Sequence, residues 1–385
     1  MQKSFFVKKL FTNLASAEWQ LCIMNYALKN RILLAIDSFK NCMTSAEAND
    51  AAAEGVRDVC PDATIIKMPV SDGGEGWMDA FVAAMGGEII EVEAFDPLMR
   101  PIMSQYAICD NTAIIEIAKA SGIALLKPTE LNPLKTNTYG TGQLVVDAIK
   151  NGCKKIIVGL GGSATSDCGI GMLTAIAENF AGGEITKIPD SQMLKAVNFT
   201  IATDVNNPLY GENGAAYIFA PQKGASPEMV KILDAQAKDF AEKMSAIFGY
   251  DCSQKHGAGA AGGLGYAFMQ FLGAECRSGA ELLFDAADFD TKIRDADLVI
   301  TGEGAADSQT LMGKLPSAVL CRAQKFGVPV ALIAGRVADR EKLLAAGFRD
   351  VVCINPDGIA PEIAMQKNVA VNNVRETAKW LLKKR

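Results

Sequence analysis

The segment VSDGGEGWMDA, residues 70–80, places three glycines and two carboxylates, Asp72 and Glu75, within five positions. It follows an apolar run that predicts a buried strand. Glycine has no Cβ atom, so such a loop can adopt positive φ and bring backbone N–H groups against an anion, while the carboxylates handle a metal ion or a proton. A tight turn before a helix explains the same residues without chemistry. The other glycine-rich loops must decide between these interpretations.

Several predicted strands end in loops of this kind. In parallel sheets, ligands bind at the carboxyl ends of the strands, so we expect these loops to line one shared cleft. Backbone N–H groups, hydroxyls and the start of a following helix would suit a phosphorylated ligand. The residues singled out in these loops are Asp37, Ser38 and Lys40; Asp72, Gly73, Gly74 and Glu75; Gly161, Gly162, Ser163 and Thr165; Asp204; and Glu303, Asp307 and Gln309.

Carboxylates that face one pocket repel each other unless cations or protons intervene. Mg²⁺ carried by ATP prefers oxygen ligands and takes one or two carboxylates in addition to phosphates. A remaining carboxylate could accept the hydroxyl proton during phosphoryl transfer. Lys40 and Lys314 could neutralise the transferring group or hold a substrate carboxylate. Each acid taken alone could equally cap a turn or a helix.

The composition excludes several other classes of site. The chain has 385 residues, 38 basic and 44 acidic side chains and a net charge of −6, and it shows no basic block, which argues against nucleic acid as a partner. The ten cysteines contain no Cys-x-x-Cys, and His256 is the only histidine, so a Cys/His zinc site is not expected. No apolar run is long enough to span a membrane. We expect a cytoplasmic protein.

Neither of two familiar nucleotide-binding patterns applies to this sequence. The Walker A spacing is absent, because Leu315 follows Gly313 and Lys314. The letters GAGAAG at 257–262 match G-x-G-x-x-G but do not follow a predicted strand, so they do not indicate a dinucleotide fingerprint, and a nicotinamide dehydrogenase is disfavoured.

The order of elements predicts an α/β protein with largely parallel sheets. Helices are expected at 44–59, where TSAE forms a capping box, at 76–85, at 140–151, after GGSATSDCG through Ala177, and at 226–249. Residues 88–118 predict three successive strands, which suggests a β-rich insertion or a second domain. The other strands are expected at 31–36, 64–70, 154–160, 199–203, 297–301, 328–334 and 350–354.

Together these motifs resemble the glycerate kinase type-1 family, over roughly residues 31–357. Many motifs in the same order make this a specific signal, although no single glycine loop is specific. The matching segments are DSFK (37–40), DGGEG (72–76), NPLKTNTYGTG (132–142), GLGGSATSD (159–167), DVNNPL (204–209), GENGA (211–215), PQKGA (221–225), GAGAAGGLG (257–265), TGEG (301–304), DSQT (307–310) and GK (313–314).

The resemblance implies ATP-dependent phosphorylation of D-glycerate, usually to 2-phosphoglycerate, although the sequence does not fix which hydroxyl reacts. It also implies two α/β domains, one flavodoxin-like with a parallel sheet and one inserted domain with a restriction-endonuclease-like core. We expect residues 31–70 and 285–385 to form the first and 71–284 the second, with ATP and glycerate in the cleft between them. Residues 1–30 have no family counterpart, and the chain could form a homodimer.

Residue roles follow from loop position and residue type, and the resemblance supports the positions more than the individual roles. We expect Asp72 or Asp204 to be the base, Lys40 and Lys314 to be cationic stabilisers, and Glu303 or Asp307 to contact Mg²⁺. Further substrate and ATP contacts are expected from the loops around Thr141, Gly259, Gly262 and Gly263. The chain departs from the family at Ala305, where relatives carry a basic side chain.

A second hypothesis is a nucleotide- or anion-sensing protein on the same fold without turnover, because fold alone does not establish catalysis. The clustered acids favour an enzyme, since an anion sensor gains nothing from five carboxylates beside phosphates. These five are Asp37, Asp72, Asp204, Glu303 and Asp307. An assay of ATP consumption with glycerate separates the two.

Overall fold

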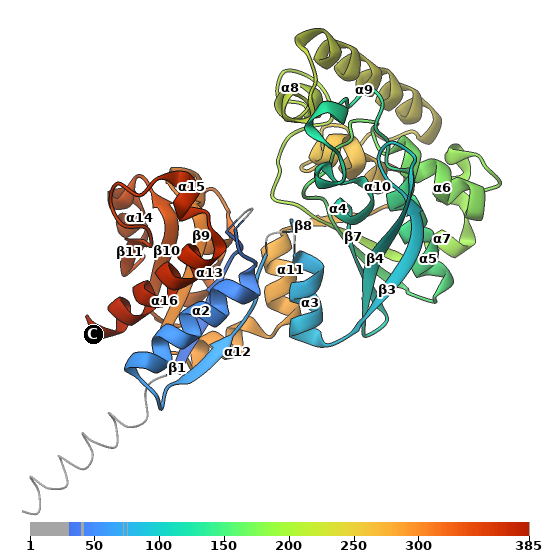
Figure 1. Cartoon of the computed structure of the whole chain (residues 1–385). Helices are drawn as coiled ribbons and strands as arrows, with labels where there is room; N and C mark the ends of the chain where they lie inside the picture. Colours follow the sequence, from blue (N-terminus) through green and yellow to red (C-terminus); the bar gives the residue numbers. More distant parts are fainter. Residues whose placement is uncertain (1–30, 40–41, 72, 75, 385) are drawn as a thin grey trace, which may run out of the picture. The chain divides into compact units, whose positions relative to one another are not determined.

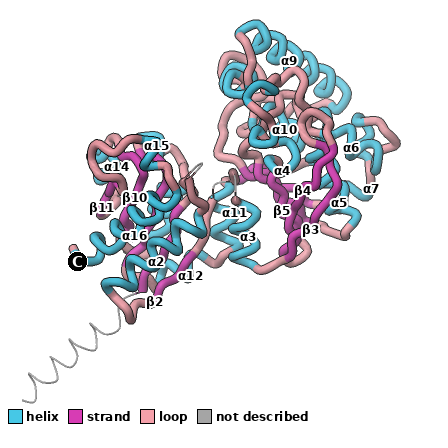
Figure 2. Tube along the Cα trace, in the orientation of Figure 1, coloured by secondary structure: helices cyan, strands magenta, loops and turns pink. Residues whose placement is uncertain are grey.

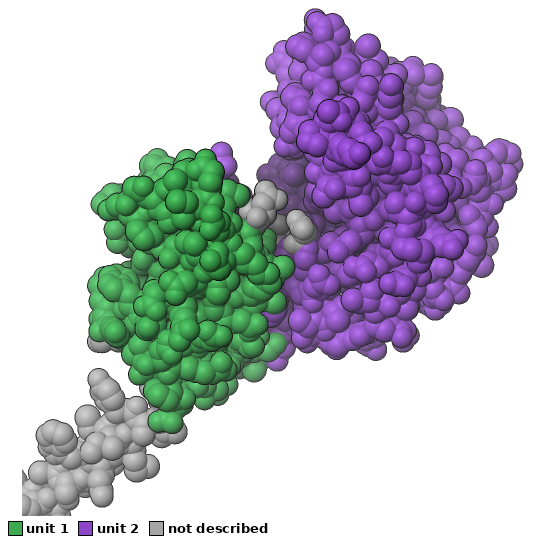
Figure 3. Space-filling view, in the orientation of Figure 1, with its two compact units in different colours: residues 1–67, 290–308, 319–385 green, residues 68–289, 309–318 purple. Residues whose placement is uncertain are grey.

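The computed structural model describes residues 31–384 except residues 40, 41, 72 and 75. Predictions for the N-terminal segment 1–30 and for Lys40, Asp72 and Glu75 therefore fall outside the described residues. The described chain forms two compact units, which Figure 3 colours separately. Unit 1 comprises the residues up to Lys67 with Asp290–Ser308 and Val319–Arg385, and unit 2 comprises Met68–Phe289 with Gln309–Ala318.

Unit 1 is built on a five-stranded sheet in the order β2-β1-β9-β10-β11, in which every neighbouring pair is parallel. Counted along the chain, this is the 2-1-3-4-5 order of flavodoxin-like folds, as predicted. The strands are β1 (Arg31–Ile36), β2 (Thr64–Lys67), β9 (Leu298–Ala306), β10 (Val330–Val337) and β11 (Asp350–Cys353).

Helices α2 and α16 lie side by side in unit 1 (Figure 1) and share one apolar core with β1, β9 and β10. Helix α2 begins with the predicted capping box, in which the Thr44 side chain accepts from the Glu47 N–H and the Glu47 carboxylate accepts from the Thr44 N–H. The helices of this unit are α2 (Ser45–Val59), α12 (Phe289–Arg294), α13 (Leu315–Gln324), α14 (Arg340–Ala346), α15 (Pro361–Ala364) and α16 (Lys367–Lys383). The start of α13, residues 315–318, groups with unit 2.

Unit 2 contains a six-stranded mixed sheet in the order β3-β4-β5-β6-β7-β8. Strands β3 to β5 are antiparallel neighbours, whereas β5 to β8 run parallel. The three strands predicted within 88–118 are confirmed as β3, β4 and β5. The strands are β3 (Glu88–Phe95), β4 (Pro101–Cys109), β5 (Thr112–Glu116), β6 (Lys155–Gly159), β7 (Asn198–Ala202) and β8 (Glu275–Arg277).

Helices surround this sheet (Figure 2), and its largest core cluster joins β5, β6 and β7 to α5, α6 and α10. The helices of unit 2 are α3 (Trp77–Met85), α4 (Ala118–Ser121), α5 (Tyr139–Lys150), α6 (Ile170–Phe180), α7 (Gln192–Lys195), α8 (Ala215–Phe219), α9 (Pro227–Phe248), α10 (Leu264–Leu272) and α11 (Gly279–Ala286). The restriction-endonuclease-like assignment of this unit stays a prediction.

Several strands depart from the sequence-based expectations. Strand β2 ends at Lys67, before the predicted end at 70, and β10 continues to Val337, beyond the predicted end at 334. The strand predicted at 297–301 continues through Ala306, so the segment Gly302–Glu303–Gly304 is part of β9 and not a glycine loop. The short strand β8 was not predicted, because three residues are too few to show a periodic pattern.

Over the residues described, none of the helices combines the length and the apolarity needed to cross a membrane. The nine cysteines of the described chain are all free thiols.

Candidate active site

In unit 1 the predicted site residues lie where the strand order reverses. The chain leaves β1 for β2 on one side, whereas β9 leads to β10 on the other, so the β1–β9 junction is the topological switch point of the sheet, where such folds bind ligands. Asp37 follows β1 directly, and its N–H donates to the Gly302 carbonyl of β9 at 2.9 Å. The Asp37 carboxylate in turn accepts from the Ser38 N–H at 2.7 Å.

Helix α2 fixes the end of β1 immediately before these residues. The fully buried Asn49 accepts from the Ile36 N–H and donates to the Ile36 carbonyl, both at 3.3 Å. The Ser45 hydroxyl donates to the same carbonyl at 2.5 Å. These bonds hold both polar groups of Ile36, so the direction in which the chain enters the Asp37 loop is set by the helix.

The two carboxylates predicted to contact a metal ion both come from the β9 region of unit 1. Glu303 lies inside the strand and is only 8 % exposed, and Asp307 directly follows the strand. Groups of three or more His, Cys, Asp or Glu side chains that could hold a metal ion do not occur within the described residues. One or two carboxylates is the number that Mg²⁺ takes when phosphates supply the remaining ligands, so this donor set fits a magnesium ion that arrives with a nucleotide.

In unit 2 the glycine-rich loops meet at the carboxyl ends of the parallel strands. The Gly161 N–H donates to the Gly73 carbonyl at 3.2 Å, and the Leu160 N–H donates to the Ala202 carbonyl at 3.1 Å. These contacts join the loop after β6 to the loop before α3 and to the end of β7. The chain therefore brings the 73–74, 159–165 and 202–204 segments to one edge of the sheet.

The 257–263 segment joins the same group through two further backbone bonds. The Gly259 N–H donates to the Asn207 carbonyl at 2.9 Å, and the Cys168 N–H donates to the Gly262 carbonyl at 3.1 Å. As expected, this segment does not follow a strand, and it leads into the short 3-10 helix η5 (Ala260–Gly263).

Some of these glycines are explained by packing alone. A Cβ atom on Gly262 would lie 2.1 Å from the Thr165 carbonyl oxygen, and one on Gly161 would lie 2.6 Å from the Gly74 Cα atom. Gly162 differs, because it is exposed, adopts φ +73° and has only the Ala118 Cβ atom near its own missing Cβ, at 3.2 Å. Gly162 is therefore the glycine of this loop whose backbone is open to a ligand.

The hydroxyls of this loop form a small buried network. The Ser163 Oγ accepts from the Thr165 N–H at 3.1 Å and lies 3.2 Å from the Thr165 hydroxyl oxygen. The ammonium group of Lys223 donates to the Thr165 carbonyl at 2.6 Å and to the Ser163 Oγ at 3.1 Å. Burial lowers the pKa of Lys223 to about 8. Lys223 thus supports the loop from the protein side.

The start of α6 does not serve as an anion site, contrary to the expectation that a helix following the loop would add its dipole. The Asp167 carboxylate accepts from the N–H groups of Gly169 and Gly171, each at 3.1 Å, and from Thr138. The Met172 N–H donates to the Thr138 hydroxyl at 2.9 Å. The protein itself therefore satisfies these donors of the first turn. Burial raises the pKa of Asp167, and the hydrogen bonds from its neighbours oppose that shift.

The remaining predicted residues are placed as follows. Asp204 is exposed and lies two residues beyond the end of β7. Burial, and to a smaller extent the charge of Asp204, raises the pKa of the Cys276 thiol. Thr141 is fully buried in α5, where its hydroxyl lies 2.7 Å from that of Ser121, so its side chain packs inside the unit. Gln309 and Lys314 belong to the Gln309–Ala318 segment that groups with unit 2.

Comparison with known proteins decides the family. The family model described as "Glycerate kinase family" matches residues 32–384. The chain belongs to the glycerate kinase family. By that membership it is a kinase.

Curated relatives and a solved structure agree with this assignment. The chain is 38 % identical over 355 residues to the glycerate kinase of Bacillus subtilis strain 168, covering 87 % of this chain and 93 % of the relative. It is 40 % identical over 327 residues to the glycerate 2-kinase of Escherichia coli K12, covering 80 % and 86 %. A crystal structure described as glycerate kinase 2 of Salmonella typhimurium LT2 matches with a TM-score of 0.77 and 38 % identity, covering 92 % of this chain and 98 % of that chain.

Two residues that organise the loop after β6 had been given no role from the sequence. Lys223 stands in the PQKGA motif and Asp167 ends the GLGGSATSD motif, so both were part of the resemblance. A single charged residue in an otherwise uncharged motif was the available signal for each. Their partners, Ser163 and Thr138, lie too far away in the sequence to be identified without the structure.

Proposed function

We propose that this protein transfers the terminal phosphate of ATP to the 2-hydroxyl of D-glycerate and so forms 2-phosphoglycerate. Family membership supports a kinase that acts on glycerate, and the name of the Escherichia coli relative, glycerate 2-kinase, favours the 2-hydroxyl. The placement of the substrates between the two predicted domains, 31–70 with 285–385 and 71–284, is kept as part of this proposal.

The observation that carries the proposal is the meeting of glycine-rich loops at one edge of the unit 2 sheet. Phosphoryl transfer needs little covalent chemistry from the protein and depends on positioning and on charge stabilisation around the phosphates. The exposed backbone at Gly162 and the hydroxyl of Ser163 offer neutral donors for phosphate oxygens beside an exposed carboxylate, Asp204. A loop of this composition is suited to hold a nucleotide's phosphates.

The residue roles in this proposal remain those predicted from the sequence. Asp204 or Asp72 accepts the proton of the attacking hydroxyl, and Lys314 and Lys40 stabilise the transferring group. Glu303 and Asp307 would hold the Mg²⁺ that accompanies ATP, and such an ion supplies charge neutralisation at the phosphate oxygens. The backbone and hydroxyl contacts to ATP would come from the loops at 73–74, 161–165 and 259–263.

The direct test is ³¹P NMR of a reaction containing the purified protein, D-glycerate and MgATP. We expect the signal of 2-phosphoglycerate to appear with ADP. A 3-phosphoglycerate signal would overturn the proposed position, and an absence of glycerate-dependent ADP would favour the non-catalytic anion sensor. The variants Asp204→Asn and Asp72→Asn, assayed in parallel, assign the base. A residue whose replacement leaves turnover unchanged is not the base.

Cytoplasmic residence, a homodimeric assembly and the absence of nucleic-acid partners remain predictions that accompany this function. The absence of basic blocks in a chain of net charge −6 supports the last of them.

A further inference from the structure

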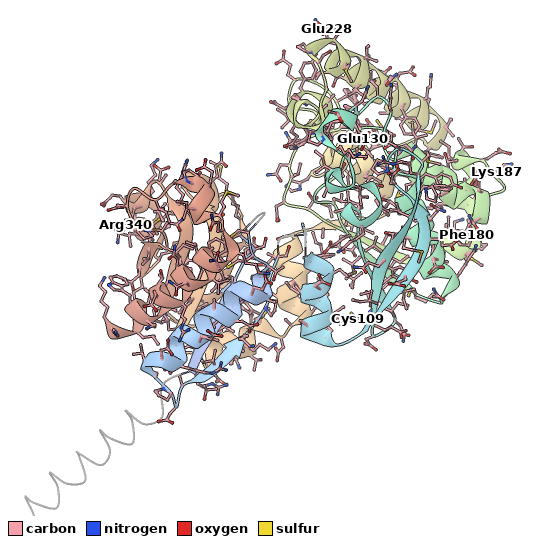
Figure 4. The ribbon with its side chains drawn as sticks, in the orientation of Figure 1. Cys109, Glu130, Phe180, Lys187, Glu228 and Arg340 are labelled. Carbon is pink, nitrogen blue, oxygen red and sulfur yellow. The ribbon has the colours of Figure 1, made fainter. Side chains whose placement is uncertain are left out.

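The lysine at position 223 is buried directly beneath the loop that follows β6. It ends the short 3-10 helix Pro221–Lys223 and is only 3 % exposed. Its ammonium group donates to the Thr165 carbonyl at 2.6 Å and to the Ser163 Oγ at 3.1 Å. Within the part of the chain that the structure describes, no carboxylate forms an ion pair with it, and the charge that acts on it is that of the buried Asp167. By contrast, the ion-paired Lys187 extends outward from the surface of unit 2 (Figure 4).

A buried cation without a paired carboxylate is expensive to maintain. The charge of Asp167 raises the pKa of Lys223 and so offsets only part of the larger effect of burial. The two atoms to which Lys223 donates are neutral oxygen atoms of one loop. The positive charge therefore acts on that loop and on whatever approaches its outer face. An anion that binds at Gly162 and Ser163 would supply a countercharge in addition to Asp167, in a low-dielectric setting where the attraction is stronger than in water.

The hydrogen bonds also determine what the Ser163 hydroxyl can do. Its oxygen already accepts from the Lys223 ammonium at 3.1 Å and from the Thr165 N–H at 3.1 Å. A hydroxyl oxygen has two lone pairs, so both are occupied and the hydroxyl can act only as a donor. Two internal acceptors lie near it, the Thr165 hydroxyl oxygen at 3.2 Å and the Thr165 carbonyl at 3.3 Å, and the carbonyl already accepts the shorter bond from Lys223. A phosphate oxygen is a better acceptor, because its negative charge strengthens the hydrogen bond.

We propose that Lys223 is a positioning residue that orients Ser163 as a hydrogen-bond donor and makes the loop after β6 selective for phosphate-type anions. Lys223 acts through Ser163 and through the electric field that it adds behind the loop, without contacting the ligand. This inference rests on the proposed function, in which that loop contacts the phosphates of ATP.

The test is the dissociation constant of MgATP, measured by titration calorimetry between pH 7.5 and 9.5. Burial holds the pKa of Lys223 near 8, so the ammonium form is lost as pH rises through this range. We expect the affinity of the wild-type protein to fall by about tenfold or more over the range, as for loss of a charge-assisted hydrogen bond. Lys223→Met should bind about tenfold or more weakly at pH 7.5 and should show no fall with pH.

The matched control is Thr136→Val. The Thr136 hydroxyl donates to the Ala164 carbonyl at 2.9 Å and is buried against the same loop, but it carries no charge. Thr136→Val removes one hydrogen bond to the loop, but the affinity for MgATP should still fall as the pH rises. Ser163→Ala should weaken binding at pH 7.5, and adding Lys223→Met to it should cost less than Lys223→Met does alone, because the two residues act through one hydroxyl.

The outcomes separate this inference from the proposed function. A wild-type affinity that stays constant from pH 7.5 to 9.5 overturns the role of Lys223 even when no variant folds, and glycerate phosphorylation in the same preparation would leave the proposed function intact. A Thr136→Val profile as flat as that of Lys223→Met would reduce Lys223 to a structural support. Binding with the expected pH profile but without glycerate turnover would support the inference and overturn the proposed reaction.

Discussion

A buried lysine without a carboxylate partner also makes the stability of the fold depend on pH. The pKa of Lys223 lies near 8 in the folded chain, below its usual value of 10.5, because burial disfavours the charged form. Between these two values the unfolded chain binds more protons than the folded chain, so stability rises with pH across this window.

We therefore expect the free energy of unfolding of the wild-type protein, relative to Lys223→Met, to increase between pH 8 and pH 9.5. The increase should reach about 2 kcal/mol at most, from 1.36 kcal/mol per pKa unit. Urea unfolding of both proteins at the two pH values measures it, and the difference cancels the other lysines and tyrosines. If the two proteins respond to pH in parallel, the Lys223 ammonium is not buried in solution.

At the scale of single residues, the sequence indicates which loops matter but not which side chains within them face outward. Ser163 and Thr165 are equally suited to contact a phosphate by type, yet the Thr165 side chain is fully buried and Ser163 remains 8 % exposed. Gly262 was expected to contact a ligand, although its missing Cβ is explained by the Thr165 carbonyl. Such distinctions depend on how distant loops pack, which no local pattern encodes.

At the scale of elements, the anchoring of α2 to the end of β1 gives a testable consequence. Asn49→Ala removes the bonds to the Ile36 N–H and carbonyl and leaves a buried backbone N–H unsatisfied. We expect a loss of about 1–3 kcal/mol in unfolding free energy, the cost of an unsatisfied buried group. We also expect a lower turnover with glycerate, because the Asp37 loop loses its fixed starting point.

Glu54→Ala is the matched control, because Glu54 lies on the exposed side of the same helix. Its replacement should change stability by less than about 0.5 kcal/mol, as for most surface substitutions. Denaturant unfolding and a glycerate kinase assay on both variants provide the comparison. An Asn49→Ala protein as stable as Glu54→Ala would contradict the proposed anchoring.

The helices that were predicted correctly begin with capping residues that can be recognised in the local sequence. The capping box at Thr44 and the capped, periodic segment after Ser226 begin helices where expected. The prediction for β9 was wrong beyond residue 301, because the glycines at 302 and 304 were interpreted as a loop. In the structure a Cβ on Gly302 would lie 2.5 Å from the Ile333 carbonyl of the neighbouring strand, so this glycine permits close strand pairing.

At the scale of the whole molecule, the flavodoxin-like strand order could be predicted only through the resemblance. Strands β1 and β9 are neighbours in one sheet although more than half of the chain separates them, and no periodicity reports such a pairing. The Gln309–Ala318 segment groups with unit 2 while its sequence neighbours belong to unit 1. The chain therefore passes between the units several times, and local patterns do not reveal where.

The proposed reaction makes one demand on both units together. The loop proposed to contact the phosphates belongs to unit 2, whereas Glu303 and Asp307, the predicted metal contacts, belong to unit 1. A ligand that binds only the folded state slows amide exchange in the segments that it holds closed. Hydrogen–deuterium exchange with MgATP and glycerate should therefore protect residues 159–168 and residues 298–307 in the same titration.

The expected slowing reaches about 100-fold at ligand concentrations near 100 times Kd, for amides that exchange only when the ligand has left. The β3–β4 hairpin, residues 88–109, contains none of the predicted site residues and serves as the internal control, with no change expected. Protection of 159–168 alone would confine the nucleotide to unit 2 and remove Glu303 and Asp307 from the proposed site. If both segments become protected at the same ligand concentration, a single bound state must involve residues of both units.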